Sequence, residues 1–225
     1  MDDIYGLIFD VDGVIGDTEA INARATIRVF DELFSLSNVK QSDFEDGIGK
    51  GAEAYILAAA RIHNIEINDE QLAGAVKLRE KHIVELFIKE PRTFEGVLEL
   101  INTALESNIF KTAIATSSSR ELSQEILKAA AVPYQRMVYI TGDMVKNKKP
   151  DPEIYLTTAR KLKIEPAKCA VIEDAPSGIQ AAKSAGCKCI AVTNTIAADK
   201  LSQADIIIDS LKQINLKKII TIINK

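Results

Sequence analysis

The segment Ile4–Val14, with the sequence IYGLIFDVDGV, constrains the fold more than any other part of the chain. An apolar run typical of a buried β-strand ends in two carboxylates, Asp10 and Asp12, and a glycine follows them. In open α/β sheets, ligands bind at the carboxyl ends of the strands. Crowded, buried carboxylates repel each other unless a cation or a shared proton compensates them. The segment therefore predicts an enzyme with a divalent metal and a reaction that uses a carboxylate.

Apolar runs of strand type alternate with stretches of helical type along much of the chain. The strand-type runs are Ile4–Phe9, Lys111–Thr116, Arg136–Ile140, Cys169–Ile172, Lys188–Val192 and Asp205–Ile208. The helix-type stretches are Glu95–Ser107, Arg120–Ala130, Pro152–Leu162 and Ser177–Ala185. Such alternation indicates a parallel sheet covered on both faces. The predicted fold class is α/β, with a Rossmann-like doubly wound parallel sheet as its core.

Residues 17–91 interrupt this alternation, because they contain helical patterns and no convincing strand. The helical patterns cover Glu19–Phe34, Lys50–His63 and Asp69–Ile88, and Asn68-Asp69-Glu70-Gln71 resembles a capped helix start. An all-helical block directly after the acidic strand predicts an inserted helical cap above the site. We expect a core of residues 1–16 and 92–225, a cap of residues 17–91, and hinges near Gly16–Asp17 and Pro91–Phe94.

Composition and charge limit the classes of binding partner and the cellular location that we expect for this protein. The net charge of −4 over 225 residues argues against a nucleic-acid binder, which would show a basic stripe. No apolar stretch approaches the roughly 20 residues that span a bilayer. Met1 is followed by two acidic residues rather than a basic segment, so we expect no secretory signal and a cytoplasmic location. The three cysteines, Cys169, Cys187 and Cys189, are expected to be reduced core thiols.

Three further features follow later strands. Thr116-Ser117-Ser118-Ser119 is a hydroxyl-rich turn that can cap a helix and present N–H groups to an anion. Lys148-Lys149-Pro150 offers an amine in a restricted backbone, and Glu173-Asp174 is a second acidic pair. Each alone has an ordinary structural explanation, as a helix cap, a solvated surface or an acidic helix start. Together, acid, hydroxyl, amine and acid at one sheet edge favour phosphoryl transfer.

These motifs resemble the four ordered motifs of the haloacid dehalogenase superfamily. The sequence is most similar to the branch that contains β-phosphoglucomutase and related sugar-phosphate phosphatases, and Val171–Ala182 is similar to the fourth motif of that branch nearly throughout. The resemblance covers essentially the whole chain, including the position of the cap. It implies a HAD-type phosphoric monoester hydrolase that acts on a small phosphorylated metabolite, with Mg²⁺ as its cofactor.

The resemblance also implies roles for individual residues. Asp10 is expected to be the nucleophile that forms an aspartyl-phosphate, and Asp12 the general acid and base whose main-chain carbonyl binds the metal. Thr116, Ser117 and Lys149 are expected to hold the phosphoryl group. The expected metal ligands are Asp10, Asp12, Asp174 and Glu173, with Glu173 acting directly or through water. An acid at position 12 also favours an oxygen leaving group, because the superfamily's dehalogenases and phosphonate-cleaving members lack one there.

Three functions remain open at this point. In the mutase, a histidine early in the first cap helix and an arginine in a cap loop assist transfer to sugar. Here Asn22 stands in the place of the histidine, and the loop Gly47–Glu53 offers Lys50, which cannot grip phosphate bidentately. A phosphatase is therefore expected, with Lys50 and the small residues beside it, Gly49 among them, contacting a compact polar substrate. The alternatives are a β-phosphoglucomutase-type mutase and a catalytically silent phosphate-binding domain. A monomer is expected.

Overall fold

A computed structural model describes residues 3–48 and 50–225; Met1, Asp2 and Gly49 lie outside the described residues. Its core is a six-stranded sheet in the order β3-β2-β1-β4-β5-β6, with all neighbouring strands parallel. The strands are β1 (Tyr5–Phe9), β2 (Phe110–Ala115), β3 (Val138–Ile140), β4 (Cys169–Glu173), β5 (Lys188–Val192) and β6 (Ile206–Ile208). The predicted fold class and all six strands are confirmed, with ends that shift by one or two residues.

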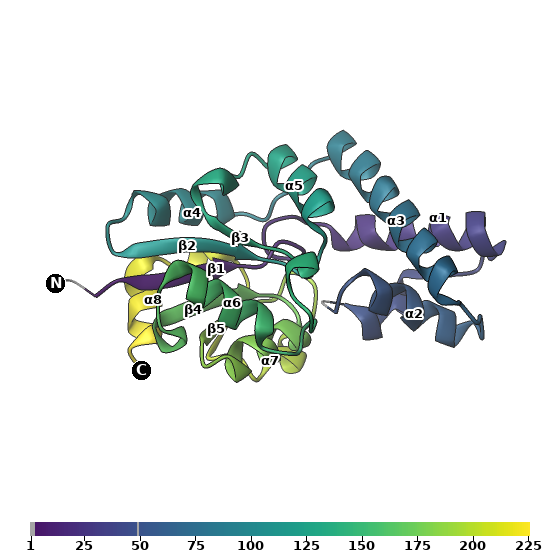
Figure 1. Cartoon of the computed structure of the whole chain (residues 1–225). Helices are drawn as coiled ribbons and strands as arrows, with labels where there is room; N and C mark the ends of the chain where they lie inside the picture. Colours follow the sequence, from purple (N-terminus) through teal and green to yellow (C-terminus); the bar gives the residue numbers. More distant parts are fainter. Residues whose placement is uncertain (1–2, 49) are drawn as a thin grey trace.

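Helices cover both faces of this sheet (Figure 1). One face carries α4 (Val97–Glu106), α5 (Arg120–Ala129) and α8 (Leu216–Ile223), and the other carries α6 (Glu153–Leu162) and α7 (Pro176–Ser184). Within β1, Leu7 and Phe9 pack into the first layer and Ile8 into the second, and all three are fully buried. This two-sided burial explains why the strand reads as a continuous apolar run.

Helix α8 is the one α-helix of the described chain that the sequence analysis did not predict. Asn215 caps it by accepting a hydrogen bond from the Lys218 N–H at 3.0 Å, and Ile219, Ile222 and Ile223 are buried against the core. Among the described residues, none of the helices combines the length and apolar composition that a membrane crossing requires.

The insertion after β1 is helical, as predicted, and lies beyond the carboxyl ends of the strands (Figure 1). It contains α1 (Glu19–Phe34), a short 3₁₀ helix (Gln41–Gly47), α2 (Ala52–Ile62) and α3 (Asp69–Lys89). Asn68 and Gln71 form the expected capping box at the start of α3. The insertion has its own apolar cluster, in which the rings of Phe44 and Tyr55 stack with centroids 4.7 Å apart.

The two connections between the insertion and the sheet lie side by side. The Asp17 N–H donates to the Arg92 carbonyl at 2.9 Å, and the Phe94 N–H donates to the Ile15 carbonyl at 3.2 Å. We propose that the boundary between core and cap lies at this paired crossing, with residues 17–91 as the cap.

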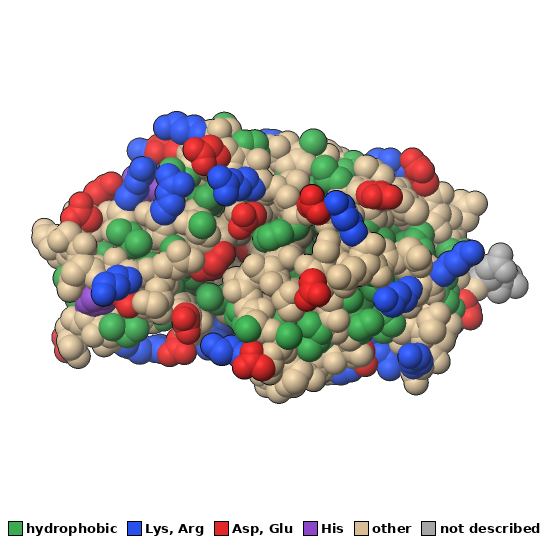
Figure 2. Space-filling view, turned by 180° about the vertical axis from the view of Figure 1, so that it is seen from behind, with side chains coloured by type: hydrophobic (Ala, Val, Ile, Leu, Met, Phe, Trp, Pro, Cys, Tyr) green, Lys and Arg blue, Asp and Glu red, His purple; other side chains and the backbone are tan. Residues whose placement is uncertain are grey.

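The surface carries both signs of charge in close mixture. Figure 2 shows Lys and Arg side chains among those of Asp and Glu across the face seen there. The three cysteines are buried and free, as expected. The expected absence of nucleic-acid and membrane partners, the monomeric state and the cytoplasmic location stay predictions.

Candidate active site

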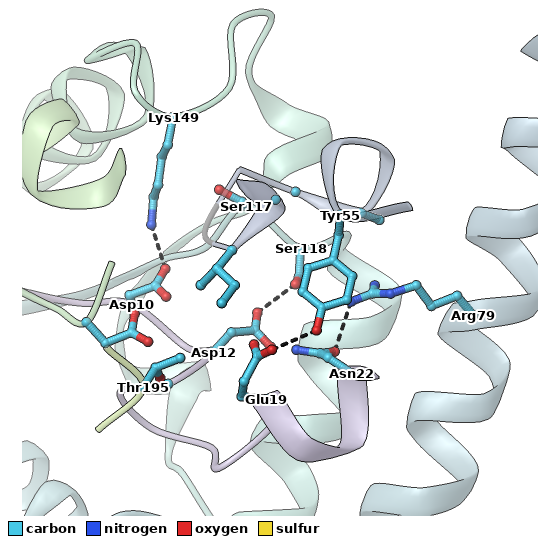
Figure 3. A pocket seen from close by; sticks show the side chains of 16 residues that line it. Asp10, Asp12, Glu19, Asn22, Tyr55, Arg79, Ser117, Ser118, Lys149 and Thr195 are labelled. Carbon is cyan, nitrogen blue, oxygen red and sulfur yellow. Dashed lines mark hydrogen bonds and ion pairs between the residues drawn. The ribbon is translucent and has the colours of Figure 1, made fainter. Parts of the chain in front are cut away.

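The parallel register brings the chemical groups expected from the sequence to one edge of the sheet. In the register, Phe9 of β1 lies beside Ile114 of β2 and Ile172 of β4. The segments that follow these three positions lead toward the cap, and they bring Asp10 and Asp174 together although these residues are far apart in the sequence. Lys149, from the connection between β3 and α6, joins them (Figure 3).

Lys149 is the centre of a buried ion-pair network. Its Nζ donates to Oδ1 of Asp10 and to Oε1 of Glu173, each at 2.6 Å, and all three side chains are less than a tenth exposed. Burial alone would lower the pKa of Lys149, but the two carboxylates outweigh it and raise that pKa. Burial raises the pKa of Asp10 to about 8, with the charges of Glu173 and Asp12 adding to the rise and Lys149 opposing it. Lys149 is therefore a permanent cation in contact with the predicted nucleophile.

Glu173 is turned beneath this site and has partners on both carboxylate oxygens. Oε1 also accepts a hydrogen bond from the Tyr155 hydroxyl at 2.5 Å, and Oε2 accepts from the N–H groups of Asp174 and Ala175 at 3.1 and 3.3 Å. A Cβ on Gly178 would overlap this carboxylate, so only glycine fits there. The arrangement makes Glu173 the residue that fixes Lys149. Tyr155, which lies in α6, was not identified from the sequence.

An acidic cluster is present where the sequence predicts a metal. Oxygens of Asp10, Glu173 and Asp174 lie within 4.8 Å of one another. Burial and the neighbouring charges of Glu173 and Asp10 raise the pKa of Asp174 well above its usual range. Gly13, with a φ of +76°, lets the chain pass so close to Asp174 that a Cβ would overlap its carboxylate. A hard divalent cation, which prefers oxygen ligands, fits this cluster, because Lys149 supplies only one positive charge to three carboxylates.

Asp12 lies on the cap side of Asp10 and is held by two hydroxyl groups. Oδ1 accepts a hydrogen bond from Thr18 and Oδ2 accepts one from Ser118, both at 2.7 Å. Thr18 stands at the start of the cap and Ser118 on the core turn after β2. The carboxyl group of Asp12 is thus fixed between the two parts of the molecule, next to Asp10 and within the same cavity.

The hydroxyl-rich turn after β2 has some side chains that line the cavity and others that stabilise the turn itself. Ser117 and Ser118 line the cavity, whereas Thr116 is fully buried and its Oγ1 accepts a hydrogen bond from the Ser118 N–H at 3.1 Å. Ser119 caps α5 by accepting from the Leu122 N–H at 3.2 Å, as expected. Thr116 therefore shapes the turn that presents Ser117 and Ser118.

The predicted substrate-binding residue Lys50 lies at the rim. It is exposed, and its Nζ donates to the Asp46 carbonyl at 2.6 Å. Gly51 and Ala52, which follow it, line the cavity that contains Asp10, while Lys50 itself faces the neighbouring hollows. Lys50 thus lies outside the cavity that contains Asp10, but it shares one neighbouring hollow with Ser117 and Lys149, and its role in substrate binding stays a prediction.

Four polar residues of the cap close the cavity opposite Asp12: Glu19, Asn22, Tyr55 and Arg79, here called the cap cluster (Figure 3). Arg79 is 5% exposed; its Nη2 donates to Oδ1 of Asn22 at 3.0 Å and its guanidinium lies 4.9 Å from the centre of the Tyr55 ring. The Tyr55 hydroxyl donates to Oε1 of Glu19 at 2.6 Å. Burial lowers the pKa of Arg79 and raises those of Glu19 and Tyr55.

Sequence reasoning identified only Asn22 of this cluster. Arg79 occupies a position of α3 that faces inward together with Ala75 and Ile83, four residues away on either side. The sequence does contain a signal for Arg79, because a charged residue on the apolar face of a helix indicates a buried polar contact. Its meaning depends on α1 and α2, because Nε of Arg79 also donates to Thr26 at 2.9 Å, a residue 53 positions away.

Comparison with known proteins agrees with this geometry. A family model described as haloacid dehalogenase-like hydrolase matches residues 7–192. Validoxylamine A 7'-phosphate phosphatase of Streptomyces hygroscopicus subsp. limoneus is 30% identical over 92% of this chain and 94% of its own length. A phosphorylated carbohydrates phosphatase of Thermotoga maritima is 34% identical over 80% of this chain and 81% of its own length.

Two further matches concern a much longer relative and a solved structure. Protein SUPPRESSOR OF QUENCHING 1 of Arabidopsis thaliana, a chloroplastic protein, is 30% identical over 97% of this chain, which spans only 21% of that longer protein. The crystal structure of β-phosphoglucomutase from Clostridium difficile superposes with a TM-score of 0.85 at 24% identity, over 98% of this chain and 97% of the other. The second match shows a common fold.

The predicted family and the predicted enzyme class, a phosphatase, are confirmed by these matches. The strand order, the helical insertion and the acidic sheet edge are all consistent with them. The chain belongs to the haloacid dehalogenase-like hydrolase family, in the branch that includes phosphatases and proteins with the β-phosphoglucomutase fold.

Proposed function

We propose that this protein hydrolyses a small phosphomonoester, a phosphorylated sugar or related polyol, through an aspartyl-phosphate on Asp10 and with a divalent cation, Mg²⁺. The observation that carries the proposal is the contact between Lys149 and Asp10 at 2.6 Å in a cavity that also contains Asp12 and Asp174. The matched phosphatases, named for a validoxylamine phosphate and for phosphorylated carbohydrates, support the substrate class.

In the first step, Oδ2 of Asp10 attacks phosphorus while Lys149 holds Oδ1. The bond between phosphorus and the leaving oxygen breaks, and Asp12 gives its proton to that oxygen, so that the free alcohol departs. Ser117 and the turn around it, together with the Lys149 ammonium, meet the phosphoryl oxygens as their charge develops.

In the second step, water attacks the phosphorus of the aspartyl-phosphate. Asp12, now ionised, takes a proton from that water, and the bond from phosphorus to Asp10 breaks. Inorganic phosphate leaves, and both carboxyl groups return to their starting states. One positioned acid therefore serves both steps, and the two hydroxyl contacts of Asp12, to Thr18 and Ser118, fix its place.

Asp10 and Asp174 would hold the cation, with the Asp12 carbonyl as a further ligand and Glu173 acting through Lys149 or through water. The cation would supply positive charge where an anionic nucleophile meets an anionic phosphate. Because burial raises the pKa of Asp10 to about 8, this charge is also what would keep the nucleophile ionised at neutral pH.

The test is phosphate release from a panel of phosphomonoesters with and without Mg²⁺. We expect Mg²⁺-dependent release that falls about a thousandfold or more in Asp10→Asn, because the nucleophile is lost. Asp31→Asn, an exposed carboxylate on α1, is the matched control and should keep wild-type activity. Brief incubation with a ³²P-labelled ester should label the wild-type protein and not Asp10→Asn.

Other outcomes point to the alternatives. Conversion of β-glucose 1-phosphate to glucose 6-phosphate with little phosphate released would establish the mutase. The rim position of Lys50 and its bond to the Asp46 carbonyl do not favour that reading. Absence of both activities in the folded, Mg²⁺-loaded protein would leave the silent phosphate-binding domain.

A further inference from the structure

A second hollow lies at the amino end of the sheet, opposite the edge that carries Asp10. It is bordered by the starts of β2 and β3 and by the end of α6, on the side of the core away from the cap (Figure 1). β3 begins beside Ala113, so no strand of the described chain pairs with Phe110–Thr112 on that side, and the hollow opens at this gap. Its volume of about 520 Å³ is within the range of sites for small molecules.

The hollow gathers positive charge. Four cationic side chains line it, and we call it the basal hollow: Lys111, Arg136, Lys161 and Lys163. Among the described residues, its lining contains neither Asp nor Glu. The chain as a whole has a net charge of −4, and elsewhere lysines such as Lys168 and Lys183 contact carboxylates at 2.6 Å. The cluster therefore does not follow from the overall composition.

The protein itself does not neutralise these four cations. Lys111 donates from Nζ to the Leu162 carbonyl at 3.0 Å, a contact that supplies no counter-charge. Within residues 3–48 and 50–225, the side chains of Arg136, Lys161 and Lys163 have neither an ion pair nor a hydrogen bond. Like charges that lie close together repel each other, so an anion that enters the hollow relieves this repulsion.

Helix and sheet geometry account for only part of this charge. Lys161 lies in the last turn of α6, where the helix dipole favours a cation. Lys111 lies on a strand, and Arg136 ends a 3₁₀ helix of three residues, so the dipole explains neither. The carboxyl end of α6 carries about half a negative charge, which the four full positive charges outweigh. Charges can also keep an exposed sheet edge from pairing with another chain, but that role requires no polar group in the interior.

The hydroxyl of Thr112 is such a polar group and is an independent sign of a ligand. Thr112 is 6% exposed and lines the basal hollow, yet its Oγ1 has no hydrogen-bond partner in the described part of the chain. Buried polar groups in proteins are nearly always hydrogen-bonded, and a hydroxyl can donate to an oxygen of a bound phosphate. Neither the helix dipole nor protection of the sheet edge accounts for an unpartnered hydroxyl at this position.

The remaining lining is mostly apolar and includes Leu105, Phe110 and Val138. A phosphate group carries about −1.5 to −2 charges at neutral pH, so four cations match two or more such groups. We propose that the basal hollow binds a small molecule that carries several phosphate groups, either an inorganic polyphosphate or a nucleoside triphosphate whose base contacts the apolar side chains. This site is separate from the cavity around Asp10, and the inference goes beyond the proposed phosphatase activity.

The test is isothermal titration calorimetry of the full chain with inorganic tripolyphosphate, in EDTA and about 0.1 M salt, where charges more than about 10 Å apart are screened. Without a metal, the three carboxylates of Asp10, Glu173 and Asp174 repel the probe from the other end of the sheet. Arg136→Gln/Lys161→Gln changes two exposed residues and should weaken binding at least tenfold. Thr112→Val keeps the shape of the side chain and should weaken binding at least threefold, because the donor is lost.

A second double variant is the matched control. Arg28→Gln/Lys217→Gln also removes one arginine and one lysine, both exposed and outside the basal hollow, on α1 and α8, and it should bind as tightly as the wild type. The same titration with ATP distinguishes the two ligand sources. Binding of ATP at least fivefold tighter than that of tripolyphosphate supports the organic ligand, and equal or weaker binding supports the inorganic one.

Three results would overturn the inference. The first is no binding of either probe at about 1 mM. The second is equal affinity in the wild type and in Arg136→Gln/Lys161→Gln, and the third is an equal loss in the matched control, which would show that general charge binds the probe. Binding of an acidic polypeptide or an oligonucleotide alone would likewise overturn it, in favour of a macromolecular partner. Failure of the proposed phosphatase activity would leave the titrations unchanged, because they need neither Mg²⁺ nor turnover.

Discussion

The hydroxyl of Tyr155 provides a sharp test of how the buried network is stabilised. It donates to Oε1 of Glu173 at 2.5 Å, and both residues are almost completely buried. Tyr155→Phe removes this single oxygen and leaves the ring in place, so no cavity forms. The change therefore reports on one hydrogen bond to a carboxylate in the interior.

The expected magnitude follows from the charge of the acceptor. Hydrogen bonds to charged groups contribute about 1.5–3 kcal/mol, against about 0.5–1.5 kcal/mol between neutral groups. Glu173 keeps its bonds to Lys149 and to two main-chain N–H groups, so its charge stays compensated. We expect Tyr155→Phe to lower the free energy of unfolding by about 2 kcal/mol, and the melting temperature by roughly 4–8 °C at 2–4 °C per kcal/mol.

The chain offers a matched control. The Tyr139 hydroxyl also makes a hydrogen bond of 2.5 Å, but its partner is the Ser123 hydroxyl and its environment is partly exposed. Tyr139→Phe should therefore cost about 1 kcal/mol or less. Urea unfolding monitored by circular dichroism measures both variants, and an unchanged dependence on urea shows that the unfolded states are comparable.

Equal losses in the two variants, or a loss below about 0.5 kcal/mol in Tyr155→Phe, would refute the reasoning. Either result would mean that the carboxylate acceptor gives no additional strength to this bond. The other contacts of Glu173 would then suffice to hold Lys149 against Asp10.

Three further predictions concern the metal cluster and the rim. Gly13→Ala forces a side chain at a φ of +76° and against Asp174, so we expect about 1–2 kcal/mol of backbone strain and at least tenfold weaker Mg²⁺ binding, measured by calorimetry. Because the folded pKa of Asp10 is raised from 3.8 to about 8, native metal-free protein retains a proton that the unfolded chain releases, and the free energy of unfolding should fall as pH rises between these values. Asp10→Asn in EDTA should show a flatter pH dependence, and an equal slope would contradict the assignment. Lys50→Ala should change kcat/KM less than threefold, as measured by phosphate release, because its ammonium is exposed at the rim.

The core of the site was predictable because parallel strands impose a simple rule. An apolar run that ends in a polar residue places that residue at the carboxyl edge of the sheet, so Asp10 and Asp174 could be brought together without knowledge of any contact. Lys149 could be assigned to this edge for the same reason. Its distance of 2.6 Å to each of two carboxylates depends on side-chain packing, which the pattern does not contain.

The same rule could not predict the cap cluster, because its residues lie on helices and not at the ends of strands. Arg79 and Asn22 lie on different helices, 57 positions apart, and helical spacing shows which face a residue occupies but not which helix lies opposite. The role of Tyr55 could not be predicted for a similar reason, because an aromatic residue on an apolar helix usually indicates only a place in the hydrophobic core. Its ring does pack against Phe44, while its hydroxyl reaches Glu19. Lys50 was assigned from its loop alone, and the fold turns it toward Asp46.

The paired crossing between core and cap has a consequence for how such a chain can change over time. Since Asp17 bonds to Arg92 and Phe94 bonds to Ile15, the sheet meets residues 17–91 as a loop whose two ends are already joined. The entropy of closing a loop grows slowly, by about 0.6 kcal/mol for each doubling of its length. Insertions or deletions in the cap should therefore cost the sheet little stability, provided that they spare the cap residues that pack into the apolar cluster of the sheet, which are Ile21, Ala25, Ile83, Leu86 and Phe87. Under the proposed function, the sheet edge that cleaves the phosphate ester and the cap surface that faces the substrate can therefore change separately within one gene.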